Sequence, residues 1–532
     1  MNLNSLTRRW RWSFLRPVAL LAMSFMSLGL VLSSHKVAAQ TSAVQSSAAQ
    51  AIAVQAREAA KSEPASAPLL VGLGEADITP PEGFPMAGYY HERLATGQRD
   101  PLKAKAVVFR SGEKVGAWVV CDLTGVSRDL CLEIRKRVSQ KTRIPESQIV
   151  VSATHSHTAP DYSRDLYDYL AGRSPAAGRP SYAPKLIDGA VNAIVRAHAA
   201  AKPASLSAGA AIQETPVSFN RRFVMQDGSV RTWQRLDTPG VVRAAGPIDP
   251  EIGLLAINAA DDAKPLGLLS SFALHLDTVG GLQWSGDYPF FIEQSLRGKF
   301  GEPFISVFGT GTCGDINHSD PVRKERNTTD VIGRSIAKSI DGALPGLRPA
   351  GFKGGLQVRT EVVKLPLQDV TDAELKRACE LIPASRAGQK IDFFDQVSAY
   401  KAVVLDHLRN KPSKVVSTDY INWGLSHSWA GVGESLPVEV TTMTIGQDVA
   451  LVFLPGEIFV DLGLAIKRSS PFRTTLVVEL SNCVETIYIP TRAAYASGSY
   501  EVTNSNVQPG SGEMLVESAI RQLRLSAQEA VK

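Results

Sequence analysis

Short apolar runs alternate with stretches of helical spacing from about Leu69 onward, and this alternation most limits what the chain can fold into. The runs are rich in β-branched residues and bounded by turn residues, which is typical of buried strands: VGAWVVC, QIVVSA, LGLLSSFAL, FISVFG, VALVFLP and TLVVEL. Apolar residues recur at helical spacing over Leu130–Gln140, Ala183–Ala201 and Asp330–Ala343. The pattern therefore predicts an α/β protein with mixed sheets flanked by helices.

The N-terminal region differs in composition from the rest of the chain. Within residues 1–39, four arginines precede an apolar run, and the small residues Val37–Ala39 follow it, as in a signal peptide. We expect cleavage near Gln40 and export to the periplasm or beyond the cell, with an uncleaved membrane anchor as the alternative. Residues 40–68, rich in Ala, Ser and Gln, are expected to be a flexible linker, and residues 69–532 a single domain.

Charge and cysteine content exclude two classes of site. Residues 1–39 carry five Lys or Arg side chains and no acidic ones, so without them the net charge of +5 falls to about zero. Without a clustered basic face, nucleic-acid binding has no support. The five cysteines are widely spaced and contain no C-x-x-C pair, so neither a thiolate zinc site nor a disulfide-dense scaffold is indicated.

Histidines and a glutamate stand where predicted strands end. QIVVSA leads into His155 and His157, LGLLSSFAL ends at His275, and VALVFLP leads to Glu457. Taken singly, each has a simpler interpretation: hydrogen-bonded surface histidines, a core histidine, or a carboxylate in the first turn of a helix. Three of the nine histidines at strand ends nevertheless favour a shared metal site.

Several motifs resemble, in their order along the chain, those of the neutral/alkaline non-lysosomal ceramidases. They are GLGEADITP at 72–80, MAGY at 86–89, THSHTAP at 154–160 and PGE at 455–457. THSHTAP is the most specific, being similar to the T-H-T-H-S-G-P of the family. The resemblance covers roughly Leu70 to Gln522 in patches and implies the ceramidase catalytic-domain fold, with a metal site at strand ends.

This resemblance implies one zinc ion per chain. The two histidines and the glutamate of the family site correspond to His155, His275 and Glu457. The family tyrosine that follows an S-N sequence corresponds to Tyr488, with Tyr495 as a looser match. Such a mixed nitrogen and oxygen set suits zinc and leaves room for a water molecule.

The resemblance also implies catalytic side chains and one departure from the family. His157 is the candidate general base or oxyanion donor, and Tyr500 is the second donor. Arg221 resembles an arginine that lines the family site, with a surface ion pair as the simpler alternative. Where the family has a serine at the catalytic centre, this chain has Asn317, which can orient water but cannot serve as that nucleophile; Ser319 is the nearest hydroxyl.

Together these features predict an exported zinc hydrolase that cleaves an amide C–N bond of a lipid or small N-acyl substrate by metal-activated water. An ester or lactone hydrolase, and a catalytically inactive lipid- or glycan-binding protein, are the alternatives. A metal-free protein would have His155 and His275 far apart. About thirty residues follow Tyr500, so we do not expect the immunoglobulin-like C-terminal domain of the family. Peripheral membrane contact and the oligomeric state stay open.

Overall fold

The computed structural model describes residues 67–174, 180–415 and 426–531, which fall within one compact unit. The predicted signal peptide lies outside the described residues, as does nearly all of the predicted linker. Export, the linker and the domain boundaries therefore stay predictions.

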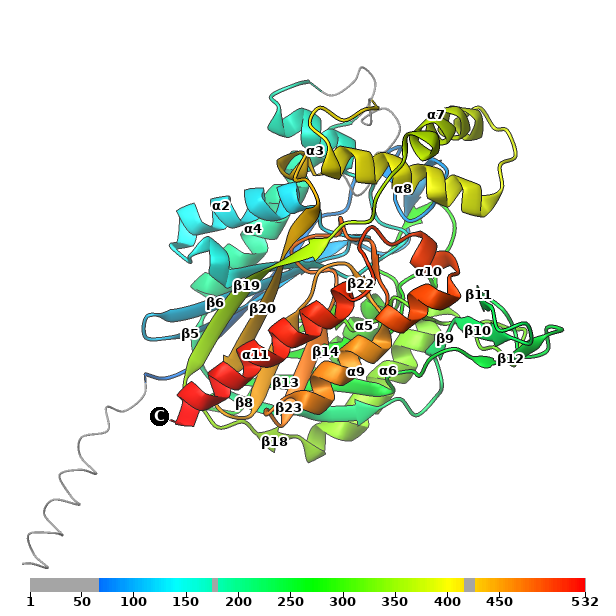
Figure 1. Cartoon of the computed structure of the whole chain (residues 1–532). Helices are drawn as coiled ribbons and strands as arrows, with labels where there is room; N and C mark the ends of the chain where they lie inside the picture. The colour runs from blue at the N-terminus through cyan, green and yellow to red at the C-terminus, as the bar shows by residue number, and fades with distance from the viewer. Residues whose placement is uncertain (1–66, 175–179, 416–425, 532) are drawn as a thin grey trace, which may run out of the picture. The chain divides into compact units, whose positions relative to one another are not determined.

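Two sheets form the centre of this unit (Figure 1). The larger sheet has the strand order β16 (Ile305–Thr310), β14 (Pro265–Phe272), β13 (Glu251–Ala259), β8 (Lys202–Ile212), β1 (Leu70–Asp77), β5 (Lys103–Ser111), β6 (Lys114–Cys121) and β7 (Ile149–Ala153), with β18 (Arg348–Pro349) also beside β8. The smaller sheet has the order β19 (Leu356–Pro366), β20 (Ser435–Ile445), β21 (Val449–Phe453) and β23 (Thr474–Val478). The pairs β6–β7, β14–β16 and β21–β23 are parallel and the others antiparallel, which confirms the predicted mixed α/β class.

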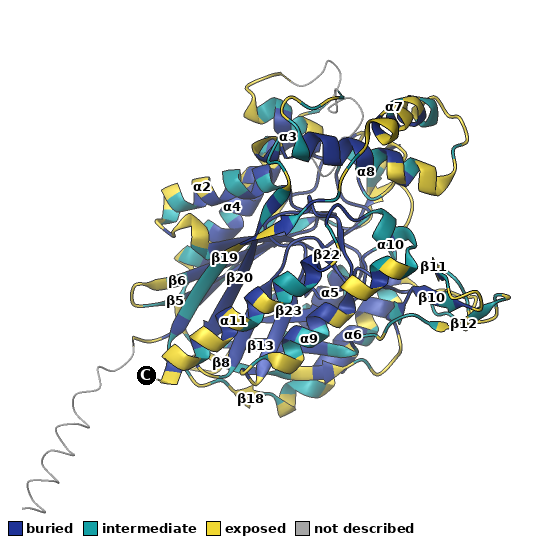
Figure 2. Ribbon diagram, in the orientation of Figure 1, coloured by how far each residue is buried: buried dark blue, intermediate teal, exposed yellow. Residues whose placement is uncertain are grey.

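The two sheets pack face to face across an apolar layer. Trp118 and Leu269 of the larger sheet share one buried cluster with Phe453 and Leu476 of the smaller sheet. These strands are buried on both faces, which explains why they appear in the sequence as continuous apolar runs rather than as alternating patterns. Figure 2 shows the same strands as the buried interior of the unit.

Helices cover the outer faces of both sheets, so the unit has four layers. The β1–β5–β6–β7 half of the larger sheet is covered by α2 (Arg128–Thr142) and α4 (Ala183–Ala199), and the other half by α5 (Tyr288–Phe300) and α6 (Thr329–Ala343). The smaller sheet is covered by α9 (Val460–Ser469) and α11 (Ser511–Val531). The three helices expected from apolar spacing correspond to α2, α4 and α6.

Two further helices lie above one end of the sheets (Figure 1). They are α7 (Asp372–Arg386), which begins with a capping box of Thr371 and Glu374, and α8 (Phe393–Arg409), whose first N–H groups are capped by Asp392. Such caps satisfy N–H groups that have no partner inside the helix. These helices share a buried cluster with the smaller sheet and bring the start of α8 to the loops of the candidate site.

Short strands and helices shape the loops at this end. The strand pairs are β2 (Pro85–Met86) with β3 (Arg93–Leu94), β4 (Gly97–Gln98) with β15 (Gln283–Trp284), β9 (Phe219–Asn220) with β17 (Ile316–Asn317), and β22 (Glu457–Ile458) with β24 (Tyr488–Ile489). A separate sheet is formed by β10 (Arg222–Met225), β11 (Val230–Thr232) and β12 (Val241–Ala244), and the short helices are α3 (Ser163–Leu170) and α10 (Tyr500–Thr503).

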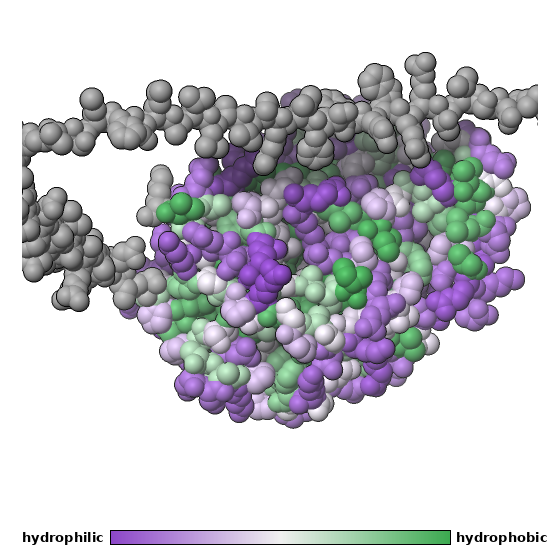
Figure 3. Space-filling model, turned by 90° about the horizontal axis from the view of Figure 1, so that it is seen from below, coloured by the Kyte–Doolittle hydropathy of each residue, from purple (hydrophilic) through white to green (hydrophobic). Residues whose placement is uncertain are grey.

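The opposite end of the sheets has a mixed surface. Figure 3 shows hydrophilic side chains interspersed with small hydrophobic groups over the part of this face that described residues form. Within the described ranges, no helix combines the length and the apolar character needed to span a bilayer.

Candidate functional site

Strand ends from both sheets meet at one place. At the end of β7, the Ala153 N–H donates to the carbonyl of Leu480, just beyond β23, at 3.1 Å. The Thr310 hydroxyl at the end of β16 donates to the carbonyl of Thr154 at 2.7 Å. The loops that follow β7, β14, β21 and β23 carry the predicted ligands, so these contacts bring the ligands together from distant parts of the sequence.

The backbone around these loops is strained. His155 has a φ of 74°, and Leu480, Asn482 and Ile487 also have positive φ values, a conformation that costs energy for residues with a side chain. The His155 N–H donates to the carbonyl of Leu123 at 2.8 Å, which helps to hold this conformation. Such strain concentrates at functional sites, where the surrounding structure maintains it.

Backbone carbonyls orient the rings of two histidines. Nδ1 of His155 lies 2.7 Å from the carbonyl oxygen of Thr124, and Nδ1 of His275 lies 2.9 Å from the carbonyl oxygen of Cys313. A carbonyl only accepts, so each Nδ1 carries the donated proton. In the neutral ring, Nε2 then has a free lone pair, which is the arrangement found for metal-binding histidines.

The Nε2 atoms of these two rings converge on one carboxylate oxygen. Oε2 of Glu457 lies 3.4 Å from Nε2 of His155 and 3.3 Å from Nε2 of His275. Nε2 of His157 lies 3.3 Å from Nε2 of His155. Oε2 of Glu457 is buried, and no described residue donates a hydrogen bond to it.

A cation fits this arrangement. Ring nitrogens of His155, His157 and His275 all lie within 4.8 Å of one another, so these three residues could hold a metal ion. Glu457 adds a negative charge and the unsatisfied Oε2 atom, and a buried polar atom without a partner is costly. The ring centroids of His155 and His275 are 4.5 Å apart, so the separation required by the metal-free alternative is not observed.

The structure separates the two candidate tyrosines. Tyr488 pairs in register with Glu457 across β22 and β24, and its hydroxyl accepts a hydrogen bond from Arg221 Nη2 at 3.0 Å. The Tyr495 hydroxyl instead donates to the carbonyl of Val507 at 2.8 Å. Tyr488 is therefore the tyrosine beside the carboxylate.

Arg221 lies inside the site, and not on the surface as its alternative interpretation required. Its side chain is buried, its Nε donates to Glu501 at 2.8 Å, and its Nη1 lies 3.2 Å from Nε2 of His275. The guanidinium thus connects two candidate ligands, His275 and Tyr488, with helix α10, which contains Tyr500 and Glu501.

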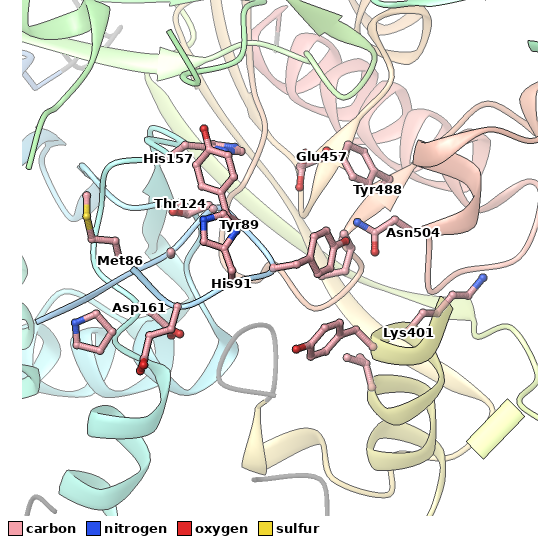
Figure 4. A pocket seen from close by; sticks show the side chains of 18 of the residues that line it. Met86, Tyr89, His91, Thr124, His157, Asp161, Lys401, Glu457, Tyr488 and Asn504 are labelled. Atoms are coloured by element: carbon pink, nitrogen blue, oxygen red, sulfur yellow. The ribbon is translucent and has the colours of Figure 1, made fainter. Parts of the chain in front are cut away.

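A cavity of about 500 Å³ opens beside these residues (Figure 4). Its wall includes His155, His157, Glu457, Tyr488 and Tyr500, together with residues of the loop between β2 and β3 and of α8. In Figure 4, Glu457 and Tyr488 lie next to each other, and His157 projects from the opposite side of the view. A substrate in this cavity would contact His155, Glu457 and Tyr488 directly, whereas His275 is not among the described residues of its wall.

Asn317 lies beside the site but outside the cavity wall. It is buried on β17, and its side-chain oxygen accepts a hydrogen bond from the Ser319 N–H at 3.1 Å. Asn317 is not among the residues that line the cavity in the described part of the chain.

The acidic residues near Asn317 have partners of their own. The residue after Asn317, His318, pairs with Asp277 at 3.0 Å. One carboxyl oxygen of Asp315 accepts from the Val460 N–H at 2.8 Å, and the other accepts from the Asn220 side-chain amide at 2.8 Å.

Burial and mutual charge shift the pKa values of this group. Burial lowers the pKa of His157 to about 3, and the charge of His155 adds to the effect, so His157 is neutral at physiological pH. Burial also lowers the pKa of His275. For His155 burial acts downward, but the Glu457 carboxylate outweighs it and raises the pKa. Burial raises the pKa of Glu457, yet the two histidines hold it well below its usual range.

Sequence reasoning missed the residues that support the ligands. The carbonyls of Thr124 and Cys313 orient the rings, and no side-chain pattern indicates a backbone acceptor. Glu479 is fully buried, and its Oε2 accepts from the N–H groups of Cys313 at 3.2 Å and Ile458 at 2.7 Å. The sequence could have indicated Glu479 as a site residue, because it stands directly after an apolar run and two residues before Ser481.

Comparison with known proteins gives a consistent result. Residues 69–317 match the family model described as neutral/alkaline non-lysosomal ceramidase, N-terminal. The chain is 26% identical over 332 residues to the neutral ceramidase of Mycobacterium tuberculosis, covering 56% of this chain and 48% of that protein. It thus spans about half the length of this curated relative.

Solved structures share the fold. The neutral ceramidase from Pseudomonas aeruginosa superposes with a TM-score of 0.64 at 20% identity, covering 87% of this chain and 75% of that one. A ceramidase complexed with C2 gives a TM-score of 0.62 at 20% identity, covering 87% and 76%. At this level of identity the likeness shows the fold alone.

Proposed function

We propose that this chain, whose residues 69–317 match the family model of the neutral/alkaline non-lysosomal ceramidases, is a zinc-dependent amidohydrolase acting on an N-acyl lipid or a smaller N-acyl amide. The observation that carries the proposal is the convergence of the Nε2 atoms of His155 and His275 on one unsatisfied carboxylate oxygen at 3.3 to 3.4 Å, beside a cavity whose wall includes His155 and Glu457. A structural core has no reason to gather acceptors in this way.

The spacing of the donor atoms supports zinc. Zinc bonds of about 2.0 to 2.1 Å at tetrahedral angles place neighbouring ligand atoms roughly 3.3 to 3.4 Å apart. Glu457 Oε2 shows this spacing to Nε2 of both His155 and His275, the ring nitrogens of the two histidines lie within 4.8 Å of each other, and Tyr488 is the fourth candidate. When bound, a zinc ion supplies Lewis acidity, which polarises a carbonyl group and makes a nearby water molecule more acidic.

The side chains around the ligands have separate tasks. His157 lines the cavity with its Nε2 3.3 Å from Nε2 of His155, so it is placed to take a proton from the attacking water and later return it to the leaving amine. Arg221 donates to the Tyr488 hydroxyl and would stabilise the negative charge that this oxygen would gain as a zinc ligand. Tyr500, on the cavity wall, is placed to donate to an oxyanion.

Water is the nucleophile in this proposal. Asn317 replaces the family serine, lacks a hydroxyl and uses its carbonyl oxygen for the Ser319 N–H. The departure therefore favours attack by water over a covalent acyl-enzyme. We also propose that the protein acts after export, on the strength of the signal-like first 39 residues; sequencing the N-terminus of the mature protein tests this.

Hydrolysis by zinc-depleted and zinc-restored protein tests the proposed activity. We expect turnover of at least one member of a panel of N-acyl amides that includes a fluorogenic ceramide, loss of turnover after chelation and recovery with zinc. Glu457→Gln should abolish turnover, whereas Asn317→Ala should change the rate without abolishing it. Turnover of esters or lactones only would replace the amide by those substrates. The absence of any turnover in zinc-loaded protein would favour the binding-protein alternative.

A further inference from the structure

We propose that Arg93 is a positioning residue for His157: it holds the backbone of this histidine, so that the ring stays beside the candidate ligands and faces the cavity. The role rests on the hydrolase function proposed above, because it requires His157 to move a proton during amide cleavage. Arg93 lies on β3 and belongs to none of the motifs that indicated the candidate site in the sequence.

The guanidinium of Arg93 binds backbone carbonyls from three segments. Its Nη2 donates to the carbonyl of Ala87 and to the carbonyl of His157, the latter at 2.6 Å, and its Nη1 donates to the carbonyl of Gly281 at 3.2 Å. A guanidinium has five N–H donors in a rigid planar arrangement, so it can hold several acceptors in fixed positions. Arg93 thereby joins the loop between β2 and β3 to the loops that follow β7 and β14.

The backbone of His157 is held from both sides. Its N–H donates to the carbonyl of Leu276, next to the candidate ligand His275, at 3.0 Å, and its carbonyl accepts from Arg93. Among the described residues, the polar contact of the His157 ring is its Nε2 atom, 3.3 Å from Nε2 of His155. No backbone carbonyl orients Nδ1 of His157 in this part of the chain, so the place of the ring depends on how the backbone is held.

The loop that Arg93 fixes also packs against the His157 ring. Gly88 has a φ of 94°, and a Cβ atom there would lie 2.9 Å from Cγ and 3.0 Å from Cα of His157, so any side chain would displace the histidine. The Tyr89 ring stands edge-on to the His157 ring, with centroids 5.9 Å apart (Figure 4). Cζ of Arg93 lies 4.1 Å from the centroid of the Tyr89 ring, a cation–π contact. Arg93 therefore holds His157 directly and through Tyr89.

An ion pair does not account for the buried charge of Arg93. The side chain is buried, its Nε has no acceptor, and no carboxylate of the described residues forms an ion pair with it. Burial lowers the pKa of Arg93, as expected for a charge without a carboxylate partner. Such a charge is costly, so it is an unfavourable choice for stability alone. Hydrogen bonds from a charged donor are stronger than neutral ones, which suits a residue that must fix a backbone in place.

Leaving-group dependence tests this role. We would measure kcat and KM of wild type, Arg93→Met and Arg93→Lys with two amides of the same acyl group, one of an alkylamine and one of nitroaniline. An alkylamine must be protonated as it leaves, whereas nitroaniline leaves with less help, so displacement of His157 should affect the alkylamide more.

For Arg93→Met we expect kcat of the alkylamide to fall by about 10- to 100-fold, the usual effect of misplacing an acid or base by about 1 Å. The loss for the nitroanilide should be at least about fivefold smaller, with KM within about twofold of wild type for both and zinc content unchanged. Arg93→Lys keeps the charge and some of the donors, so it should recover part of the loss and of the difference between the amides.

Arg135→Met is the matched control. Arg135 is also buried, and its Nε donates to a backbone carbonyl, that of Ile149, at 2.7 Å. It is not among the described residues of the cavity wall. This substitution should lower the urea midpoint of unfolding but change kcat by the same small factor for the two amides.

Several outcomes would overturn the role of Arg93. Equal losses of kcat for the two amides, or loss of zinc from Arg93→Met, would mean that the arginine only supports the fold or the metal site, and an unchanged kcat would mean that His157 does not depend on it. The rate at which diethyl pyrocarbonate modifies His157, followed by peptide mass spectrometry, requires no turnover and so separates this proposal from the hydrolase function. It should rise severalfold in Arg93→Met but not in Arg135→Met, and an unchanged rate would refute the positioning even in a protein that hydrolyses no amide.

Discussion

Replacing Glu479 should weaken both the fold and metal binding, because this carboxyl group joins the supports of two candidate ligands. Its Oε2 accepts from the N–H of Ile458, directly after Glu457, and from the N–H of Cys313, whose carbonyl orients His275. Its Oε1 lies 3.1 Å from the Cys313 sulfur. Glu479→Ala leaves two buried N–H groups without a partner, at about 1 to 3 kcal/mol each, so we expect a loss of roughly 2 to 6 kcal/mol in the free energy of unfolding.

The same substitution should weaken zinc affinity by about 10- to 100-fold, the usual effect of removing a group that orients a ligand. Glu479→Gln is the matched control. Burial raises the pKa of Glu479 to about 8, so its carboxyl group is neutral at pH 7 and glutamine preserves shape and charge. We would measure urea unfolding of the metal-free protein and zinc affinity by competition with a chelating dye. Equal effects of the two substitutions, or unchanged zinc affinity in Glu479→Ala, would refute this reasoning.

Two further predictions concern buried charges away from the ligands. Burial raises the pKa of Glu485 from 4.5 to about 7, so between these pH values the folded protein holds a proton that the unfolded chain releases. The free energy of unfolding should therefore fall by about 3 kcal/mol as the pH rises through this window. Glu485→Gln should flatten the profile of urea unfolding against pH, and an unchanged slope would contradict this prediction. Glu439 forms a buried ion pair with Arg135 at 2.8 Å, so Glu439→Ala should lower the free energy of unfolding by about 3 to 5 kcal/mol. Glu133→Ala, which breaks a more exposed pair with Arg137, should lower it by less than about 1 kcal/mol. Similar losses in the two variants would contradict the expected effect of burial.

The class of fold was predictable because buried strands leave a strong local pattern. VGAWVVC and VALVFLP are apolar at every position, since β6 and β21 face a neighbouring layer on both sides. How the two sheets pair was not predictable. That arrangement depends on contacts such as Trp118 against Phe453, whose positions in the sequence carry no mutual signal.

The candidate ligands were predictable from their place after strands, but their supports were not. His155, His275 and Glu457 each follow an apolar run, and strand ends of both sheets meet at one edge. The choice between Tyr488 and Tyr495 required the β22–β24 register. The contribution of α8 to the cavity wall was not predictable either, because local propensity specifies a helix but not where it lies.

Metal analysis of the purified protein tests the central claim, that the histidines and Glu457 form a zinc site. Wild type and Asn317→Ala should each contain about one zinc per chain, whereas His155→Ala and Glu457→Ala should contain far less after the same dialysis. Full zinc content in both ligand variants, or no zinc uptake by folded wild type, would contradict the assignment.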